Sequence, residues 1–301
     1  MTRFEIEAFL AVIRYGSISA AADHLFVTQP ALSRRIQALE EELGYDLFHR
    51  GKGIRTVTLT QEGEAFVSVA EKWMNVCREA LAISNLKQKP VLNLASVGSV
   101  STYLLPNILR KIMSDENEYN LCFHMYHSFE SYSYVESGLV DIALVSDDMY
   151  HRTVVTTPLF KEPFVVIGGP AWNGRERIHP TELDPRDEIW LPWNPEFSAW
   201  HDKWFDVSIY PKVQLDHMTL LEEFLVGKNY AIAPLMVAQR IKEQKSQAES
   251  VHICCLYDGP EDEIIYGLTL PGNERKAPLI RQFLELLKQE LKMFEGVQGY
   301  L

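Results

Sequence analysis

Cysteine and long apolar segments are scarce in this sequence. The four cysteines, Cys77, Cys122, Cys254 and Cys255, are too irregularly spaced for a disulfide scaffold, and no CxxC or HxxxH pair indicates a structural metal. No apolar run reaches the roughly 18 residues of a membrane helix, and the first residues lack the basic and apolar regions of a signal peptide. We therefore expect no membrane partner, no metal or other cofactor, and a cytoplasmic location.

Catalytic signatures are also absent. The sequence contains no Gly-rich phosphate loop and no G-x-S-x-G nucleophile motif. We therefore predict no catalytic residue and a protein that is not an enzyme. Catalysis on a two-lobed α/β domain stays open as one alternative. A solute-binding receptor without a regulatory role is another, but such a receptor would need a signal peptide.

The composition that is present is typical of soluble globular proteins, with 301 residues, of which 47% are hydrophobic and 23% charged. A chain of this length is expected to form two or three domains. Its net charge of −12 is unevenly distributed, because seven basic and seven acidic residues balance within the first 60 positions. A polyanion such as DNA is therefore expected to bind the N-terminal segment.

Three helices are predicted in the N-terminal segment. Apolar side chains recur at helical spacing over residues 4–15 and stop at Gly16, and a short second helix covers residues 19–25. Thr28 can cap a third helix through its hydroxyl, and Gly44 ends that helix. Its apolar residues fall on one face, which we expect to pack inward.

The opposite face of the third helix is polar. Such side chains can bond to base edges, and their place at the start of a helix after a short turn is typical of a DNA recognition helix. The candidate DNA-binding residues on this helix are Thr28, Gln29, Pro30, Ser33, Arg34 and Gln37. A small three-helix bundle with a polar face is the alternative on these helices alone.

A basic loop after the three helices favours the DNA-binding interpretation. Arg50, Lys52 and Arg55 accompany two glycines, and residues 56–59 alternate as a strand does. A short hairpin with three positive charges at its tip would form a wing that contacts phosphates or the minor groove. We add these three basic residues to the candidate DNA-binding set.

A long helix is predicted after Thr60, whose hydroxyl can cap it, with Glu62 and Glu64 at the positive end of the helix dipole. Apolar residues then follow a heptad pattern. The candidate dimerisation residues are Phe66, Val69, Trp73, Val76, Ala80 and Ile83. This face could pack against its own chain, but we favour the pairing of two chains, since a DNA-reading module needs a twin.

The region after residue 89 has the pattern of an α/β fold. Residues 87–90 break the long helix and form a hinge. Strand-like runs occupy residues 91–97, 121–126, 142–145, 164–167, 213–215, 230–233 and 264–270, and amphipathic helices occupy 103–113, 220–226 and 279–292. A region of this size can form two small lobes with a ligand site between them.

Polar side chains follow several predicted strands or precede predicted helices. Ligands of α/β folds bind at these places, where free backbone N–H groups favour a carboxylate or another anion. The candidate effector-binding residues found in this way are Ser99, Ser101, Thr102, His127, Ser128, Ser146, His217 and Thr219. Each Ser or Thr taken singly could be a simple helix cap, so their convergence is what indicates a site.

A dense pattern of residues extends from position 17 to position 63. It comprises Ser17, Ala21, Ala22, Leu25, Gln29, Pro30, Ala31, Leu32, Ser33, Ile36, Leu39, Glu40, Leu43, Gly44, Leu47, Phe48, Arg50, Leu59, Thr60 and Gly63. This pattern resembles the N-terminal module of LysR-type transcriptional regulators. The sequence departs mildly from the family pattern at two places. Thr28 stands where serine is usual, and Glu41 and Glu42 make the end of the recognition helix acidic.

The resemblance implies an architecture and a function. The fold would be α/β, with an N-terminal winged helix-turn-helix, a long linker helix, and a two-lobed α/β effector domain resembling periplasmic binding proteins. The chain would self-associate as a dimer and then as a homotetramer. It would be a transcription regulator that binds an interrupted dyad in promoter DNA, and a small-molecule effector between the lobes would change DNA binding or bending.

The resemblance also implies boundaries and site residues. Residues 1–60 would form the DNA-binding domain, 61–89 the linker helix and hinge, and 90–301 the effector domain, with lobe 1 at about 90–161 and 268–301 and lobe 2 at about 162–267. The lobe crossings would lie near residues 161–163 and 266–268. Phe197 and Ser198 join Ser99, Ser128 and Ser146 in the loops that touch the effector.

Two further clusters have open interpretations. The aromatic residues Trp190, Trp193, Phe197, Trp200 and Trp204 could line a pocket for an aromatic effector, although a Trp-rich core is the commoner explanation. The adjacent Cys254 and Cys255 could form a redox switch. We expect a buried strand instead, because neighbouring cysteines bond to each other only with strain and no basic neighbour is evident to activate them.

Overall fold

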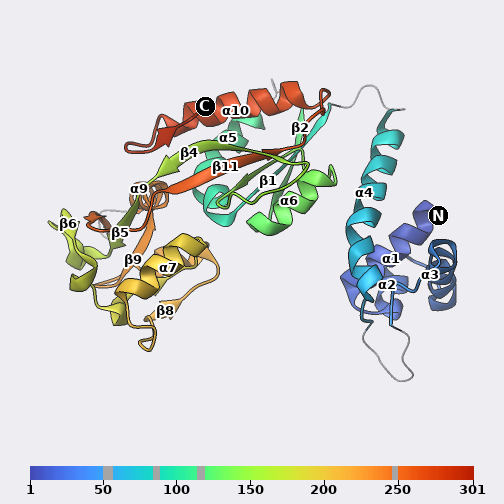
Figure 1. Ribbon diagram of the computed structural model, residues 1–301, viewed down its shortest axis with the longest axis horizontal. Helices are drawn as coiled ribbons and strands as arrows, with labels where there is room; N and C mark the ends of the chain where they lie inside the picture. The colour runs from blue at the N-terminus through green and yellow to red at the C-terminus, as the bar shows by residue number, and fades with distance from the viewer. Residues whose placement is uncertain (50–56, 84–88, 114–118, 246–249) are drawn as a thin grey trace. The chain divides into compact units, whose positions relative to one another are not determined.

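The computed structural model describes residues 1–49, 57–83, 89–113, 119–245 and 250–301. The chain divides into two compact units, Met1–Lys89 with Ser137–Leu139, and Pro90–Glu136 with Val140–Leu301 (Figure 1). We call them the N-terminal and C-terminal units and describe each by itself. Within the described ranges, no helix is long and apolar enough to cross a bilayer.

Helices form most of the described N-terminal unit: α1 (Arg3–Tyr15), α2 (Ile18–His24), α3 (Gln29–Leu43) and α4 (Gln61–Ile83). The Ser17 hydroxyl accepts a hydrogen bond from the Ala20 N–H at 3.1 Å, and the Thr28 hydroxyl accepts one from the Ala31 N–H at 3.4 Å. Gly44 ends α3 in the left-handed conformation, with φ of +79°. The predicted cap and end of the third helix are therefore confirmed.

Aromatic rings join α1 to α4 in the core of this unit. The Phe9 ring centroid lies 5.4 Å from that of Phe48 and 5.3 Å from that of Phe66. Phe48 also forms an antiparallel bridge with Leu59, which closes the base of the predicted wing. The wing loop with Arg50, Lys52 and Arg55 lies outside the described residues.

A six-stranded mixed sheet organises the first lobe of the C-terminal unit (Figure 1). In spatial order its strands are β12 (Gln298–Gly299), β4 (Val155–Glu162), β11 (Glu263–Thr269), β3 (Ile142–Val145), β1 (Val91–Ser96) and β2 (Asn120–Met125). β1 pairs in parallel with β2 and β3, so the carboxyl ends of these three strands meet at one edge. β11 runs antiparallel to both β3 and β4.

Helices cover both faces of this sheet, as Figure 1 shows. Leu92 and Leu94 of β1 pack with Phe283 on one face, and Ala95 packs with Tyr132 on the other. This alternation follows from the pleat of a strand, which sends successive side chains to opposite faces. The helices are α5 (Leu105–Ile112) and α10 (Ala277–Leu291) on the first face and α6 (Ser128–Glu136) on the second.

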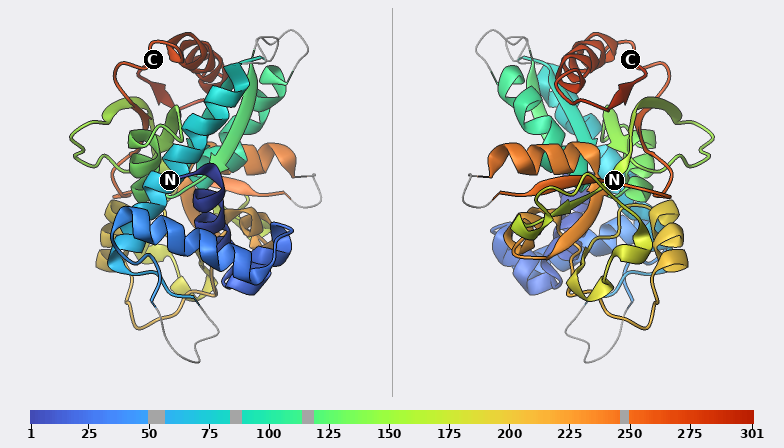
Figure 2. Two further views of the ribbon diagram at one scale, coloured as in Figure 1. Left: turned by 90° about the vertical axis from the view of Figure 1, so that its right-hand side faces the viewer. Right: turned by 90° about the vertical axis from the view of Figure 1, so that its left-hand side faces the viewer.

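A four-stranded sheet organises the second lobe. Its strands are β6 (Arg177–Ile178), β10 (His252–Leu256), β5 (Phe164–Gly168) and β9 (Tyr230–Pro234), and β7 (Ile189–Trp190) pairs separately with β8 (Val213–Gln214). The helices of this lobe are α7 (Pro195–Trp204), α8 (Leu221–Phe224) and α9 (Leu235–Gln244), with short 3-10 turns at Pro170–Trp172, Pro180–Glu182, Pro185–Asp187 and Met218–Leu220. In Figure 2, α9 lies along the strands of this sheet, against which Val237 and Ile241 are buried.

The chain passes between the two lobes on neighbouring strands. β4 leads into β5 through Pro163, which lies within the residues 161–163 where the crossing was expected. The return lies at residues 257–262, between β10 and β11. The predicted return at residues 266–268, and the lobe boundary drawn there, are wrong because these residues lie within β11, paired with β3 and β4.

Several elements differ from the sequence-based prediction. β4, α6, α7 and α9 were not among the predicted strands and helices, whereas the strand expected at Cys254 and Cys255 is β10. The predicted helix at residues 103–113 begins earlier, as a wider π-type turn over Val100–Leu104 that leads into α5. Gly227 takes a left-handed φ of +57°, so the strand ending in Pro234 starts after a glycine turn even without a second glycine.

Most of the aromatic cluster packs into the core of the second lobe, and one cysteine of the adjacent pair is buried. Trp193 and Phe197 are buried in the core of the second lobe, with the Trp193 indole N–H donating to the Ile232 carbonyl at 2.7 Å. Cys254 is buried and Cys255 exposed, since successive residues of β10 face opposite sides. Burial raises the pKa of the Cys254 thiol, which keeps it protonated.

Replacing Glu40 should destabilise the N-terminal unit. The buried Glu40 carboxylate accepts the Leu47 and Phe48 N–H groups at 2.8 and 3.3 Å, so Glu40→Ala leaves two buried donors without this partner. We expect a loss of about 2 kcal/mol, and therefore about 30-fold faster exchange of core amides in α1 and α3. The control is Glu41→Ala at the exposed neighbouring position, and equal exchange in both variants would contradict the role of Glu40.

Candidate DNA-binding and ligand-binding sites

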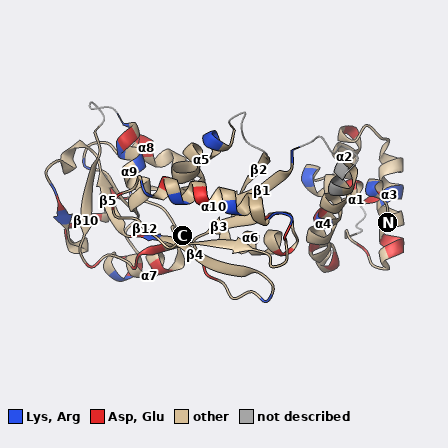
Figure 3. Cartoon of the chain, turned by 90° about the horizontal axis from the view of Figure 1, so that it is seen from above, with Lys and Arg blue, Asp and Glu red and all other residues tan. Residues whose placement is uncertain are grey.

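The predicted recognition helix α3 presents its polar residues to the surface. Thr28, Gln29, Pro30, Arg34 and Gln37 are exposed and Ser33 is half-buried, while Leu32, Ile36 and Leu39 are buried on the opposite face. Figure 3 shows basic and acidic positions at different places along α3, because Arg34 and Arg35 precede the run Glu40 to Glu42. The basic part therefore lies toward the start of the helix.

The two adjacent arginines of α3 have different surroundings. The Arg35 guanidinium lies over the Phe4 ring, 5.2 Å from its centroid, and is half-buried, whereas Arg34 is exposed. Sequence reasoning did not include Phe26, which is 95% exposed in the turn before α3 and has a positive φ of 55°. The sequence feature that could have identified Phe26 is an aromatic residue in a turn, where polar residues are usual.

The heptad face of α4 divides into two parts. Phe66 is buried and Trp73 packs partly against the core of the N-terminal unit, so the assignment of Phe66 to the dimer face is wrong. Val69 and Val76 are 51% and 60% exposed, and Ala80 is exposed as well. The helical period of 3.6 residues explains the division. A heptad pattern drifts slowly around a helix of this period, so some of its residues face the core of the N-terminal unit and others face solvent.

A cavity of about 530 Å³ lies between the two lobes of the C-terminal unit, and we call it the ligand cavity. Polar residues from the first lobe line it at the carboxyl ends of β1, β2 and β3. The predicted residues that it brings together are Ser99, Thr102, His127, Ser128, Ser146 and His217. The rule that ligands bind beyond the carboxyl ends of parallel strands thus located this cavity.

Four predicted effector-binding residues do not line the ligand cavity. The Ser101 and Ser198 hydroxyls donate to backbone carbonyls within their own turns, those of Gly98 and Asn194, at 2.8 and 3.2 Å. Phe197 is buried against Phe164, with ring centroids 5.1 Å apart. Thr219 bonds to the His217 ring at 2.7 Å instead. Each of these side chains is occupied by a local partner.

The ligand cavity also has an apolar part of its lining, of which the sequence reasoning missed Met125 and Phe129. Met125, Phe129, Trp193 and Met218 join the polar residues in its lining. Met125 and Phe129 are 54% and 71% exposed, an unusual position for large apolar side chains. The sequence could have identified both residues, because Met125 and Phe129 lie close to the predicted effector-binding residues His127 and Ser128.

Hydrogen bonds cross between the lobes beside the ligand cavity. The Tyr103 hydroxyl donates to the Met218 carbonyl at 3.0 Å, and the Tyr103 carbonyl accepts from the Arg240 Nε at 3.0 Å. Arg240 of α9 also pairs with Glu290 of α10 at 3.1 Å. Burial raises the pKa of the Tyr103 phenol, so it remains a donor. These bonds couple the cavity wall to the packing of α9 against the first lobe.

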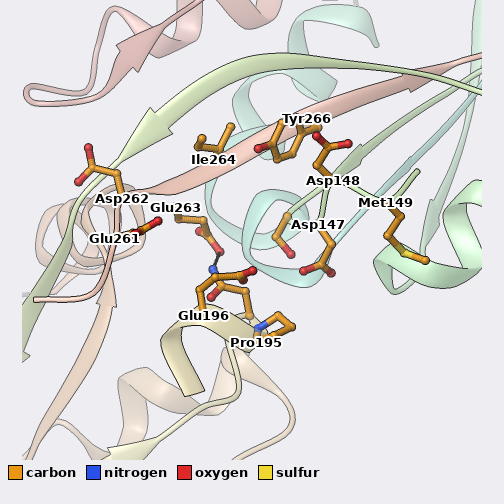
Figure 4. A pocket seen from close by; sticks show the side chains of 12 residues that line it. Asp147, Asp148, Met149, Pro195, Glu196, Glu261, Asp262, Glu263, Ile264 and Tyr266 are labelled. Atoms are coloured by element: carbon orange, nitrogen blue, oxygen red, sulfur yellow. Dashed lines mark hydrogen bonds between the residues drawn. The ribbon is translucent and has the colours of Figure 1, made fainter. Parts of the chain in front are cut away.

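A second cavity of about 490 Å³ adjoins the ligand cavity and shares Ser146 and Asp147 with it. We call it the acidic cavity, because its lining includes Asp147, Asp148, Glu196, Glu261, Asp262 and Glu263 (Figure 4). Among the described residues, no lysine or arginine lines either cavity. The lining therefore does not support the expected preference for a carboxylate or another anion.

Burial perturbs two glutamates at the lobe crossing. Burial raises the pKa of Glu263 to about 8, and the hydrogen bond from the Asn194 side chain at 3.5 Å lowers it only partly. Burial also raises the pKa of Glu162 well above its usual range, with the neighbouring Glu263 adding to the effect. Glu162 lies opposite Glu263 in the β4–β11 pairing.

The two units together define a class of protein. A helix-turn-helix unit with an exposed polar recognition helix, joined to a two-lobed α/β unit with a cavity between its lobes, is the architecture of a ligand-responsive DNA-binding regulator. Residues 5–64 match the family described as bacterial regulatory helix-turn-helix protein, lysR family, and residues 87–292 match the LysR substrate binding domain. The chain belongs to the LysR family of transcriptional regulators.

Individual relatives support this assignment. The HTH-type transcriptional regulator ClcR of Pseudomonas putida is 25% identical over 304 residues, which cover 94% of this chain and 97% of ClcR. A solved structure of full-length CbnR with its target DNA has a TM-score of 0.67 and 19% identity, and the match covers 96% of this chain and 100% of CbnR. A full-length OxyR variant from Pseudomonas aeruginosa has a TM-score of 0.65 and 19% identity, covering 100% of this chain and 98% of OxyR. The two structures show a shared fold.

Val76→Glu should separate paired chains without unfolding them. The substitution places a carboxylate on the exposed stripe formed by Val69 and Val76, where a partner helix would otherwise exclude water. We expect sedimentation velocity to show a smaller species with an unchanged circular dichroism spectrum. Ser68→Glu adds the same charge at an exposed position off the stripe and should sediment like the wild type. Wild-type sedimentation of Val76→Glu would disprove this dimer surface.

Proposed function

We propose that a small molecule bound in the ligand cavity changes how this regulator binds promoter DNA. The observation that carries the proposal is that both lobes line one cavity, with Ser99 and Thr102 from the first and Trp193 and His217 from the second. A ligand that touches both lobes has different contacts when their angle changes. It can therefore shift the population of lobe arrangements.

We infer that the DNA site is an interrupted dyad bound by two copies of α3. A single α3 can reach only a few base pairs, and a second copy related by symmetry doubles the contact. The exposed residues Val69 and Val76 of α4 support pairing of the chains, and two such pairs would give a tetramer. The solved structure of CbnR with its target DNA supports the same use of the N-terminal unit here.

The hydrogen bonds beside the ligand cavity suggest how occupancy would be transmitted. Met218 lines the cavity, and its carbonyl accepts the Tyr103 hydroxyl from the other lobe. A ligand that displaces Met218 would weaken this bond and, through the Tyr103 carbonyl, the contact with Arg240. The lobes would then settle at another angle, which requires that the ligand binds the two arrangements with different affinity.

Arg34→Ala and Arg55→Ala should weaken DNA binding in different ways. The exposed Arg34 on α3 is suited to a bidentate contact with a guanine, so its loss should cost about 1 to 3 kcal/mol, concentrated at one base pair. Arg55→Ala should weaken binding to operator and scrambled DNA alike and reduce the salt dependence by about one phosphate contact. Fluorescence anisotropy on an operator selected from genomic fragments measures both. Equal losses on all sequences for both variants would contradict the assignment of Arg34 to base recognition.

Filling the ligand cavity should remove the response to a metabolite. A thermal-shift screen of metabolites with the full chain identifies a ligand, and Thr102→Trp should lower its affinity at least tenfold because the indole occupies the cavity. Ser133→Trp adds the same ring at an exposed position of α6 and should bind as the wild type does. Unchanged affinity in Thr102→Trp, with a native circular dichroism spectrum, would place the ligand elsewhere.

A further inference from the structure

The acidic cavity concentrates negative charge between the lobes. Six carboxylates line it, contributed by the loop after β3, by α7, by the return crossing and by the start of β11: Asp147, Asp148, Glu196, Glu261, Asp262 and Glu263. Figure 4 shows Asp147, Glu196 and Glu263 around the same space. The nearby cation Lys161 pairs with Asp262 at 3.5 Å, which leaves the other five carboxylates without it. The negative potential of these carboxylates favours a cation in this space.

Glu263 is the second, independent feature of this cavity. Its side chain is only 3% exposed, yet it lines the cavity. Its one hydrogen bond among the described residues, from the Asn194 side chain to Oε1, spans 3.5 Å, the outer limit for such a bond. Among the described residues, no hydrogen bond reaches the other oxygen, Oε2, of this cavity-lining side chain. A buried carboxylate in this state is normally satisfied by a bound partner.

Glu162 is a second buried glutamate beside Glu263. The two residues oppose each other across β4 and β11, so their side chains leave the sheet on the same face. The Glu162 Oε2 accepts the Met236 N–H at 2.5 Å, but its Oε1 has no hydrogen-bond partner within the described part of the chain. No lysine or arginine faces this pair in the described cavity lining.

We propose that the acidic cavity binds the ammonium group of an organic amine, with Glu263 as its principal partner. This inference rests on the proposed function, because the amine would be the effector or part of it. The shared residues Ser146 and Asp147 allow the ligand's carbon chain to continue into the ligand cavity, where Met125, Phe129 and Met218 offer apolar contacts. The ligand class is thus an amine with an aliphatic chain, and a diamine can use Asp147 and Asp216 as well.

An organic ammonium fits better than a metal ion. In the described residues, no group of three or more His, Cys, Asp or Glu side chains is arranged to hold a metal. The cavity of about 490 Å³ also exceeds what a single ion needs, whereas an ammonium group on a carbon chain fills such a space and donates up to three hydrogen bonds.

Binding of the amine should release a proton. With a pKa of about 8, the Glu263 carboxyl is mostly protonated at pH 7, and the ammonium favours its ionised form. The groups that face it are Asp147, Glu162 and Glu196, with Asn194 as a donor and the Lys161–Asp262 pair at the rim. The affinity for the amine should therefore rise about tenfold per pH unit below the pKa of Glu263 and level off above it.

The test is isothermal titration calorimetry of the full chain with cadaverine, pentylamine, glutarate and magnesium chloride. Cadaverine should bind most tightly and pentylamine more weakly, whereas glutarate and magnesium chloride should give no heat of binding. Titrations at pH 7 in phosphate and in HEPES, whose ionisation enthalpies differ and neither of which is a primary amine, should show release of close to one proton per cadaverine. Binding of glutarate or magnesium without cadaverine, or binding without proton release, would overturn the proposal.

Matched variants separate the cavity from general charge effects. Glu263→Gln keeps the shape of the side chain and should lower cadaverine affinity at least tenfold and abolish proton release. Asp148→Asn, at the exposed edge of the cavity, should lower it about threefold by weakening the local field without altering the core. Glu285→Gln removes the same charge at an exposed position of α10 and should bind as the wild type does. Wild-type affinity in Glu263→Gln would overturn the proposal.

The outcome is distinguishable from that of the proposed function. Operator binding that responds to another metabolite, in a protein that ignores all the amines, would overturn the amine proposal alone. Cadaverine binding through Glu263 in a protein that enriches no DNA sequence would support the site and contradict the regulator's proposed response. Each proposal can therefore be contradicted while the other is supported.

Discussion

The antiparallel pairing of β4 with β11 is the constraint on which the C-terminal unit depends. These strands lie side by side in the six-stranded sheet, and the chain enters and leaves the second lobe at their neighbouring ends. The change of lobe angle that we propose would therefore occur at this two-strand connection. The same pairing sets Glu162 opposite Glu263, so the acidic cavity is built at the place where the lobes would move.

Local chemistry made the N-terminal unit predictable. Gly16, Thr28 and Gly44 act within a turn of the helix that each one bounds, and the structure places each as a cap. Long-range pairing in the C-terminal unit has no such local signal. β12 joins β4, and β10 lies between β5 and β6, because of contacts between residues far apart in sequence. Tyr266 was therefore assigned to a crossing although it lies in the middle of a strand.

Some residues of the candidate site could likewise be predicted from the sequence, and others could not. Ser99, Ser128 and Ser146 could be found because strand ends are visible in the sequence and parallel strands share an edge. Phe197 and Ser198 were misplaced, since the face of a short helix that meets the core depends on the packing of the whole lobe. Glu263 gave no sequence signal, because a carboxylate before an apolar strand looks like an exposed turn residue until the opposite strand buries it.

The most direct test of the account is the thermodynamic coupling between DNA and ligand. The ligand with the highest affinity in the thermal-shift screen is titrated into the full chain with and without its selected operator, and the operator is titrated with and without the ligand. If one equilibrium between lobe arrangements controls both sites, the operator must change the ligand affinity by the same factor by which the ligand changes the operator affinity. This factor is typically 5- to 150-fold. A ligand affinity that is the same with and without DNA would contradict the central claim that the cavity between the lobes controls DNA binding.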